Sequence, residues 1–176
     1  MSAAVEFQAV DILFARQPGR AGRTAVRDAL AALDGGATRG DIQSKFGVIV
    51  GVAGANLAVA RGDISVLMGL SGSGKSTLLR AANGLNPVTR GHVQIHTGDA
   101  TIDVATCDTA QLRRVRRECV AMVFQQFGLL PWRTVRENVG FGLELRGEGA
   151  AARRTIVDEK LELVGLSQWA DRKSVV

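Results

Sequence analysis

The sequence is poor in aromatic residues, cysteine and proline. Only 5% of its 176 residues are aromatic, tyrosine is absent, and it has two cysteines and three prolines. Cys107 and Cys119 lack metal-ligand spacing, so we expect free thiols rather than a disulfide framework or a zinc site. No apolar run approaches the roughly 20 residues that a membrane-spanning helix needs. A basic segment followed by an apolar one, typical of a signal peptide, is also missing. We therefore expect a soluble, cytoplasmic chain.

The residues that are present suit one medium-sized domain with a hydrophobic core. Hydrophobic residues make up 46% and charged residues 22% of the chain, which is ordinary for a globular protein. The net charge is +5 and comes mostly from arginine. A basic balance permits nucleic acids, anionic lipids or nucleotides as partners and selects none of them.

One stretch, residues 69–77, fits the pattern G-x-x-x-x-G-K-[ST]. The apolar run Ile64–Met68 precedes it and predicts a buried strand. Good helix formers at 78–82 follow it. A strand, a glycine-rich loop and a helix in this order are the context of a phosphate-binding loop, whereas a glycine-rich turn without a ligand is the alternative.

The residue types in this loop explain how it would hold phosphate. Gly69, Gly72 and Gly74 let the backbone curl so that its N–H groups surround an anion. The helix that begins near Lys75 directs further N–H groups at the same place. We expect Lys75 to reach the β- and γ-phosphates and the Ser76 hydroxyl to ligate Mg²⁺. The chain is thus predicted to bind a nucleotide.

Hydrophobic periodicity and capping residues predict the other elements. Strands are expected at 5–14, 47–52, 56–60 and 91–96, and helices at 24–33, 38–46, 108–117, 135–145 and 149–164. His92 and His96 would share one face of their strand, which favours surface histidines over a metal site. Four arginines within 113–117 suggest nucleic-acid binding, but a solvated helix face is favoured because no aromatic residues are interleaved.

Two further segments bear on function. The run Cys119–Phe124 is almost continuously apolar and predicts a strand buried on both faces of a parallel sheet. It ends at Gln125–Gln126, and the carboxyl end of a buried strand is where α/β proteins place ligands. The apolar loop 129–132 is either a docking surface or folded back on the core, and the sequence does not favour one over the other.

Three of these pieces together resemble the ATP-binding subunit of ABC transporters: the loop 69–77, the run Val123-Phe124-Gln125, and the run Thr134-Val135-Arg136-Glu137-Asn138. The stretch 66–91 and the N-terminal helical insert resemble importers of quaternary amines such as glycine betaine, proline betaine and choline. The resemblance implies an α/β fold, a P-loop NTPase core of the ABC ATPase type with a mixed sheet. It implies a subunit that couples ATP hydrolysis to uptake of such a compound.

The resemblance also implies a domain plan. Residues 1–45 would form an N-terminal strand and helical insert. Residues 46–125 would form the nucleotide-binding core with its phosphate loop and glutamine loop. Residues 126–176 would begin a helical subdomain.

Site residues follow from the resemblance position by position, with ATP and Mg²⁺ as cofactors. Nucleotide contacts would come from the loop residues Gly69, Ser71, Gly72, Ser73, Gly74, Lys75, Ser76 and Thr77. Gln125 would touch Mg²⁺ and the attacking water, so Ser76 and Gln125 are the expected metal ligands. Phe46 lies 29 positions before Lys75 and would stack on adenine; its alternative is a core residue of a strand.

The implied partners are those of an importer. They are a second ATP-binding subunit, a membrane permease that docks on Phe127–Arg133, and, indirectly, a periplasmic or lipid-anchored binding protein. No nucleic acid is expected. The subunit would lie on the inner face of the plasma membrane.

The sequence departs from the family pattern after residue 173. The L-S-G-G-Q signature, the following Asp-Glu strand and the switch histidine are not found, and both histidines precede Gln125. We therefore expect an amino-terminal portion of such a subunit, with weak nucleotide binding and negligible turnover. Ile64–Met68 would then be left uncovered. Alternatives are a P-loop small-molecule kinase, a nucleic-acid-binding protein that uses Arg113–Arg117, and a non-catalytic remnant.

Overall fold

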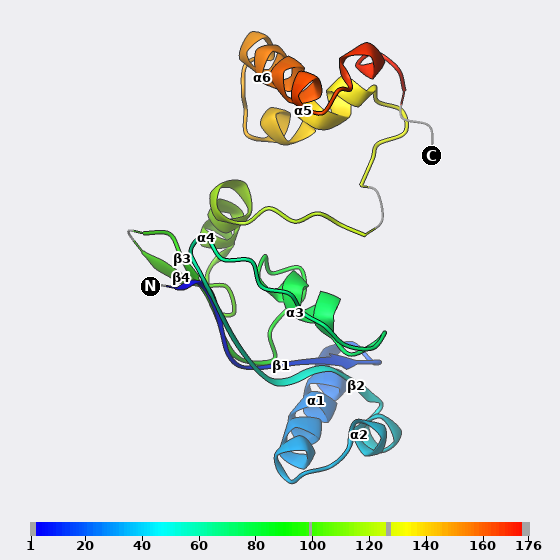
Figure 1. The fold of residues 1–176 in the computed structure, drawn as a ribbon. Helices are drawn as coiled ribbons and strands as arrows, with labels where there is room; N and C mark the ends of the chain where they lie inside the picture. Colours follow the sequence, from blue (N-terminus) through cyan, green and yellow to red (C-terminus); the bar gives the residue numbers. More distant parts are fainter. Residues whose placement is uncertain (1–2, 99, 126–127, 174–176) are drawn as a thin grey trace. The chain divides into compact units, whose positions relative to one another are not determined.

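The computed structural model describes residues 3–98, 100–125 and 128–173 (Figure 1). The chain divides into two compact units, unit 1 over residues 1–121 and unit 2 over residues 122–176. Each unit has hydrophobic clusters of its own.

Unit 1 is built on an antiparallel sheet with strand order β2-β1-β3-β4. The strands are β1 (Ala3–Ala15), β2 (Val48–Ala60), β3 (Arg90–His96) and β4 (Thr101–Asp103). The two strands expected at 47–52 and 56–60 are one strand, β2. Its pairing with β1 shifts register between Val52 and Ala55, where Gly54 has a φ of 56°. This bulge lets one long strand follow β1 over its whole length.

A buried carboxylate fixes the bulge and ties the sheet to the helical insert. Asp11 is 1% exposed, accepts a hydrogen bond of 2.7 Å from the Gly54 N–H, and receives the Arg90 Nε at 2.6 Å. The two terminal nitrogens of Arg90 each bind Asp34 at 2.8 Å. Asp34 ends helix α1 (Gly19–Asp34), so Arg90 joins the insert to the sheet.

The predicted insert helices are confirmed. They are α1 and α2 (Arg39–Phe46), which begins at a capping box of Thr38 and Asp41 and ends at Gly47 with a φ of 62°. Both helices pack on one end of the sheet through a cluster that they share with β1 and β2, made of Leu13, Ala29, Ile42, Val48 and Val50.

The larger cluster of unit 1 lies between the sheet and the helices that follow the glycine loop. It is formed by Phe7, Val10, Ile12, Val52, Leu78, Ala81, Val93, Ile95, Ile102, Val104 and Val115. Helix α3 (Lys75–Ala81) contributes Leu78 and Ala81. Helix α4 (Thr109–Arg114) leads into a π-helical turn, η1 (Val115–Cys119), which contributes Val115. The core therefore anchors the helix that carries Lys75.

The expected basic helix is present as α4 followed directly by η1, which together span residues 109–119, and Arg114 and Arg116 bond to nearby groups. Arg114 Nε lies 3.1 Å from Glu118, and Arg116 donates to the carbonyls of Asn83 and Gly84 at 2.8 and 3.1 Å. Arg116 thereby bonds the chain just after α3. This agrees better with a structural role than with nucleic-acid binding.

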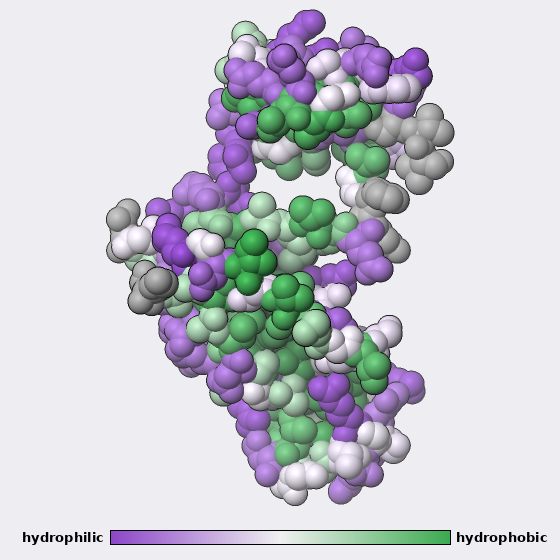
Figure 2. Space-filling model, viewed as in Figure 1, coloured by the Kyte–Doolittle hydropathy of each residue, from purple (hydrophilic) through white to green (hydrophobic). Residues whose placement is uncertain are grey.

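Two predicted strands are wrong. Ile64–Met68 is irregular, and Ile64 and Met68 are 92% and 89% exposed, in accord with the expectation that this run stays uncovered. Cys119 ends η1, and the residues after it are irregular, with Val123 98% exposed. A strand needs a hydrogen-bonded neighbour, and in the described part of the chain all strand ladders are antiparallel and lie elsewhere. Figure 2 shows hydrophobic residues on the surface of unit 1.

Unit 2 is a pair of helices, α5 (Val135–Leu145) and α6 (Ala150–Leu163), followed by the short turn η2 (Ser167–Trp169). Its small core contains Val157, Leu161 and Ala170. The predicted capping box of Thr134 and Glu137 is confirmed. No helix in the described ranges is long and apolar enough to cross a membrane.

The loop before α5 is held by an asparagine. Asn138 accepts from the Leu130 N–H at 2.8 Å and donates to the Leu130 carbonyl at 3.1 Å. Leu130 is half-buried, whereas Trp132 is 67% exposed. The loop is therefore bonded to α5 at Leu130, whereas Trp132 is exposed to solvent.

Candidate nucleotide-binding site

The glycine-rich loop lies between the irregular run 64–68 and α3. Gly72 has a φ of 77° and Gly74 a φ of 100°, in the left-handed region that favours glycine. Helix α3 begins directly after Gly74, at Lys75. The loop and the first turn of the helix thus have the backbone form that the motif predicts.

Two glycines let the start of α3 lie against β2. A Cβ on Gly74 would lie 2.2 Å from the Gly51 carbonyl oxygen. A Cβ on Gly51 would lie 2.9 Å from the Phe14 ring and 3.1 Å from the Thr77 methyl. Only glycine fits at both places. Gly51 was missed by the sequence analysis, although an isolated glycine inside a strand pattern signals a close backbone approach.

The Lys75 ammonium lies inside the loop. Its Nζ donates to the carbonyls of Gly69 and Leu70 at 2.7 and 2.8 Å and to the Ser73 hydroxyl at 3.2 Å. An ammonium has three donors, so three loop oxygens satisfy it. A bound phosphate would have to replace these oxygens around Lys75.

The other loop side chains differ in exposure. Ser71, Ser73 and Ser76 are exposed, whereas Thr77 is half-buried. The Thr77 carbonyl accepts a hydrogen bond of 3.1 Å from the Asn86 side chain. Asn86 follows α3 in the chain, so this bond ties the first turn of α3 to the segment after the helix. The Ser76 hydroxyl is therefore free to meet a cation from solvent. A single hydroxyl fits Mg²⁺, which keeps most of its ligands as water and phosphate oxygens.

Phe46 is not the strand residue that was the alternative to stacking on adenine. It is the last residue of α2, not part of a strand, and it is half-buried against the cluster that joins the insert to the sheet. The Lys45 ammonium lies 5.3 Å from the centre of its ring. The ring also lines a cavity of about 180 Å³ beside Arg16 and Gly22. Stacking on adenine stays a prediction.

Gln125 is exposed and belongs to unit 2, whereas Ser76 belongs to unit 1. That these two side chains meet at one Mg²⁺ stays a prediction. Gln126 and Phe127 lie outside the described residues.

The two histidines have short-range partners on the sheet. His92 Nδ1 lies 2.7 Å from Asp103, and His96 Nδ1 lies 2.8 Å from the Thr101 hydroxyl. The His92 contact also helps to lower the pKa of Asp103, against the opposing effect of burial. Across the described ranges, no group of three or more His, Cys, Asp or Glu side chains is arranged to hold a metal.

Comparison with known proteins connects this loop to one family. A family model described as ABC transporter matches residues 52–175. The chain is 45% identical over 138 residues to the glycine betaine/proline betaine transport system ATP-binding protein ProV of Escherichia coli, covering 78% of this chain and 34% of ProV. It is 46% identical over 142 residues to the trimethylamine N-oxide transport system ATP-binding protein TmoW of Ruegeria pomeroyi, covering 81% of this chain and 40% of TmoW.

The fold is similar to that of solved ATP-binding cassettes. A dimeric cassette in a post-hydrolysis state, bound to ADP and Pi, superposes with a TM-score of 0.70 at 26% sequence identity. The match covers 96% of this chain and 61% of that one. The chain thus spans between 34% and 40% of the length of the two curated relatives named above.

Proposed function

This chain belongs to the ABC transporter family, and on that premise we propose that its loop 69–77 binds ATP with Mg²⁺. The nucleotide would lie over the loop, with its phosphates at the first turn of α3. The family match favours an ABC transporter subunit over a small-molecule kinase as the kind of protein that carries this loop. ATP hydrolysis is proposed for the whole protein, of which this chain forms the phosphate-binding part.

The arrangement of Lys75 carries the proposal. Its ammonium is held in the middle of a curled loop by two backbone carbonyls, Gly69 and Leu70. The glycine contacts with β2 fix the backbone around it. A cation placed in this way, at the start of a helix, is preorganised for an anion with several oxygens.

Each loop residue then has a definite task. Lys75 would exchange its two carbonyl acceptors for β- and γ-phosphate oxygens. The backbone N–H groups of 72–77 would donate to the phosphates, and the Ser76 hydroxyl would hold Mg²⁺, which supplies positive charge against the phosphates. Gln125 would orient water at the same cation, and Phe46 would stack on the adenine.

Isothermal titration calorimetry of the 176-residue chain with MgATP tests the proposal. We expect saturable binding that Lys75→Ala weakens at least roughly tenfold, because charge-assisted contacts to phosphate are lost. Lys160→Ala removes an exposed lysine of α6 and is the matched control, which should bind as the unmodified chain does. Equal affinities for all three proteins would place the nucleotide elsewhere, and no binding to the folded chain would refute the proposal.

We further propose that the whole protein serves the uptake of a compound with a methylated, positively charged nitrogen, such as glycine betaine, proline betaine or choline. The names of ProV and TmoW, which are transport proteins for betaines and for trimethylamine N-oxide, support this because these compounds share that chemistry. Uptake of labelled glycine betaine by cells with and without the gene tests this part. Equal uptake would contradict it.

The proposed assembly is that of an importer on the inner face of the plasma membrane. A second ATP-binding subunit would pair with this one, as in the dimeric cassette to which the chain is similar. A permease would dock on the region 127–133, and a binding protein would act through the permease. The exposed Trp132, on a loop that Asn138 holds in place, supports docking there.

A further inference from the structure

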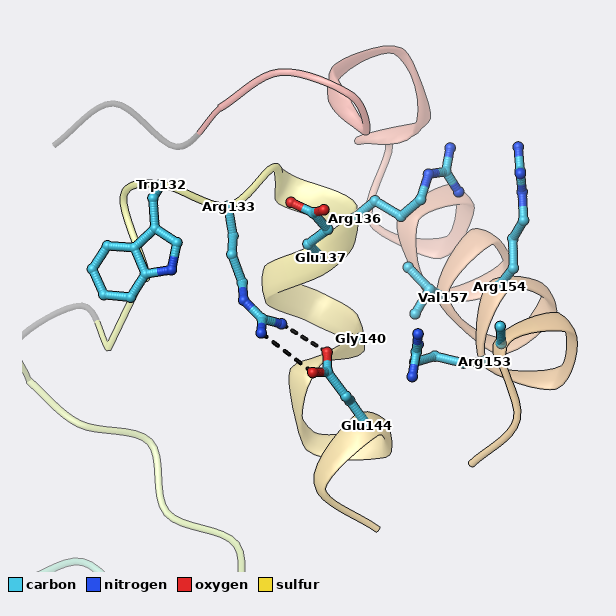
Figure 3. A pocket seen from close by; sticks show the side chains of 10 residues that line it. Trp132, Arg133, Arg136, Glu137, Gly140, Glu144, Arg153, Arg154 and Val157 are labelled. Atoms are coloured by element: carbon cyan, nitrogen blue, oxygen red, sulfur yellow. Dashed lines mark hydrogen bonds and ion pairs between the residues drawn. The ribbon is translucent and has the colours of Figure 1, made fainter. Parts of the chain in front are cut away.

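Arg116 binds main-chain carbonyls, whereas arginines elsewhere in the protein bind carboxylates. In unit 2, for example, Arg133 binds the Glu144 carboxylate in the cavity between α5 and α6 (Figure 3). Arg116 lies on η1 in unit 1 and donates to the carbonyls of Asn83 at 2.8 Å and Gly84 at 3.1 Å. Both carbonyls belong to the turn that ends helix α3.

This turn has the hydrogen bonds of a common helix ending. The Leu85 N–H donates to the Arg80 carbonyl at 2.9 Å, and the Gly84 N–H donates to the Ala81 carbonyl at 3.0 Å. This pair of bonds closes many helices at a left-handed glycine, and Gly84 has a φ of 66°. The guanidinium supplies donors to two further carbonyls of the turn, and its positive charge lies at the negative end of the helix dipole.

Packing fixes the guanidinium at this place. Val115, the residue before Arg116, is fully buried in the cluster that also contains Leu78 of α3. A Cβ on Gly84 would lie 2.8 Å from a Leu112 methyl group and 3.4 Å from the Arg116 Nη2 atom. The end of α3 therefore contacts α4 and η1 through both packing and hydrogen bonds.

Helix α3 is too short to hold its shape by itself. It has seven residues, about two turns, and helices of that length are not stable in isolation. Its N-terminal end is held by the contact of Gly74 with β2, and its first turn by the Asn86 side chain. Arg116 supplies the contact at the C-terminal end. A change at that end should therefore reach Lys75 and Ser76, which lie in the first turn.

We propose that Arg116 is a positioning residue for phosphate binding. By holding the C-terminal end of α3, it keeps Lys75 and Ser76 at the opposite end in the place where they meet the phosphates and Mg²⁺. It acts through the helix and not by touching the nucleotide. Because Arg116 is exposed, solvent screens its charge and the effect on affinity is moderate. This inference rests on the proposed function, since it names a residue that supports the proposed site.

Nuclear magnetic resonance of the nucleotide-free, 176-residue chain tests how α3 is held. We expect Arg116→Gln to shift the amide signals of Lys75 and Ser76, although the substitution lies at the other end of the helix. Hydrogen exchange of the Leu78 amide should become faster by at least roughly threefold, because the helix opens more often. These signals report the position of α3 before any ligand is added.

Calorimetry with MgATP measures the consequence for binding. Arg116→Gln should weaken binding by roughly three- to tenfold, because a smaller fraction of molecules has α3 in the binding position. Arg116→Lys should keep part of the affinity, because the charge remains at the helix end while the two-carbonyl fork is lost. Arg114→Gln is the matched control. It removes the same charge from an exposed arginine that pairs with Glu118, and it should bind within about twofold of the unmodified chain.

Ile102→Val separates positioning from a general loss of stability. It removes one methyl group from the same hydrophobic cluster, on β4, at the opposite edge of the sheet from β2. It should lower the resistance to urea and leave both the MgATP affinity and the Lys75 amide signal unchanged.

Four outcomes would overturn the proposal. They are unchanged amide signals in Arg116→Gln, unchanged MgATP affinity in Arg116→Gln, and an equal loss of affinity in Arg114→Gln or in Ile102→Val. Should Arg116→Gln not fold, Arg116→Lys decides, because an affinity equal to that of the unmodified chain would show that the guanidinium is not needed. Failure of the folded, unmodified chain to bind MgATP would refute the proposed function, whereas the amide signals of the nucleotide-free chain would still test Arg116.

Discussion

At the scale of single residues, Arg90 is the side chain that connects distant parts of unit 1. It binds the buried Asp11 of β1 and the exposed Asp34 at the end of α1. Asp11 in turn fixes the bulge of β2 through Gly54. One guanidinium therefore bridges the sheet and the insert, 56 residues apart along the chain.

This contact predicts a pH dependence. The hydrogen bonds from Arg90 lower the pKa of Asp34 below its ordinary value of 3.8. A carboxylate with a lowered pKa contributes its stability in full above the ordinary value and loses it as pH falls through the lowered one. Titration of Asp34 by NMR should show this pKa, and Arg90→Gln should raise it toward 3.8.

Arg27→Gln is the control for that titration, because Arg27 pairs with its neighbour Asp28 on the same helix. It should leave the Asp34 titration where it is in the unmodified chain. An Asp34 pKa that is the same with and without Arg90 would contradict the assigned contact.

At the scale of elements, unit 1 has a well-formed antiparallel sheet and an apolar segment outside it. Ile12 lies in the centre of β1 with no exposed surface, whereas Ile64 is 92% exposed in the irregular run before the glycine loop. The two isoleucines have the same chemistry and opposite surroundings. Substitution of each isoleucine therefore tests which apolar segments stabilise the fold.

Replacement of each isoleucine by alanine should have very different effects. Ile12→Ala should lower the free energy of unfolding by about 2–5 kcal/mol, because it leaves a cavity in the core. Ile64→Ala should change it by less than about 0.5 kcal/mol, because Ile64 is almost fully exposed. Urea denaturation followed by circular dichroism measures both. A similar loss for the two variants would mean that the run 64–68 is buried in solution.

At the scale of the whole molecule, the hydrophobic clusters among the described residues each lie within one unit. Two of them lie in unit 1, where they support β1, β2 and α3. The third lies in unit 2 and contains only Val157, Leu161 and Ala170 as buried members. The glycine-rich loop therefore depends on the clusters of unit 1, and the α5–α6 pair depends on the small cluster of unit 2.

This separation predicts that a core change in unit 2 leaves nucleotide binding intact. Leu161→Ala should destabilise the α5–α6 pair by about 2–5 kcal/mol, which is large for so small a core. The Trp132 indole signal should lose its native position, while MgATP affinity by calorimetry stays within about twofold. Leu163→Ala, on an exposed side chain of the same helix, is the control. Joint loss of both properties would show that the two units fold together.

The sequence by itself determined the local features of this protein. Glycine spacing and Lys75 predicted the loop, and residue pairs such as Thr38 with Asp41 and Thr134 with Glu137 predicted the helix starts, because these depend on neighbours a few positions away. The family resemblance was confirmed for the same reason, since it rests on such short motifs.

Only the tertiary structure decided which apolar runs have partners. The runs 64–68 and 119–124 are as hydrophobic as β1, but pairing depends on a neighbouring strand that periodicity does not reveal. The role of Gly51 likewise arises where residues distant in sequence come into contact. The short motifs therefore predicted the glycine-rich loop and its candidate nucleotide contacts, and the packing of distant segments decided which elements support that loop.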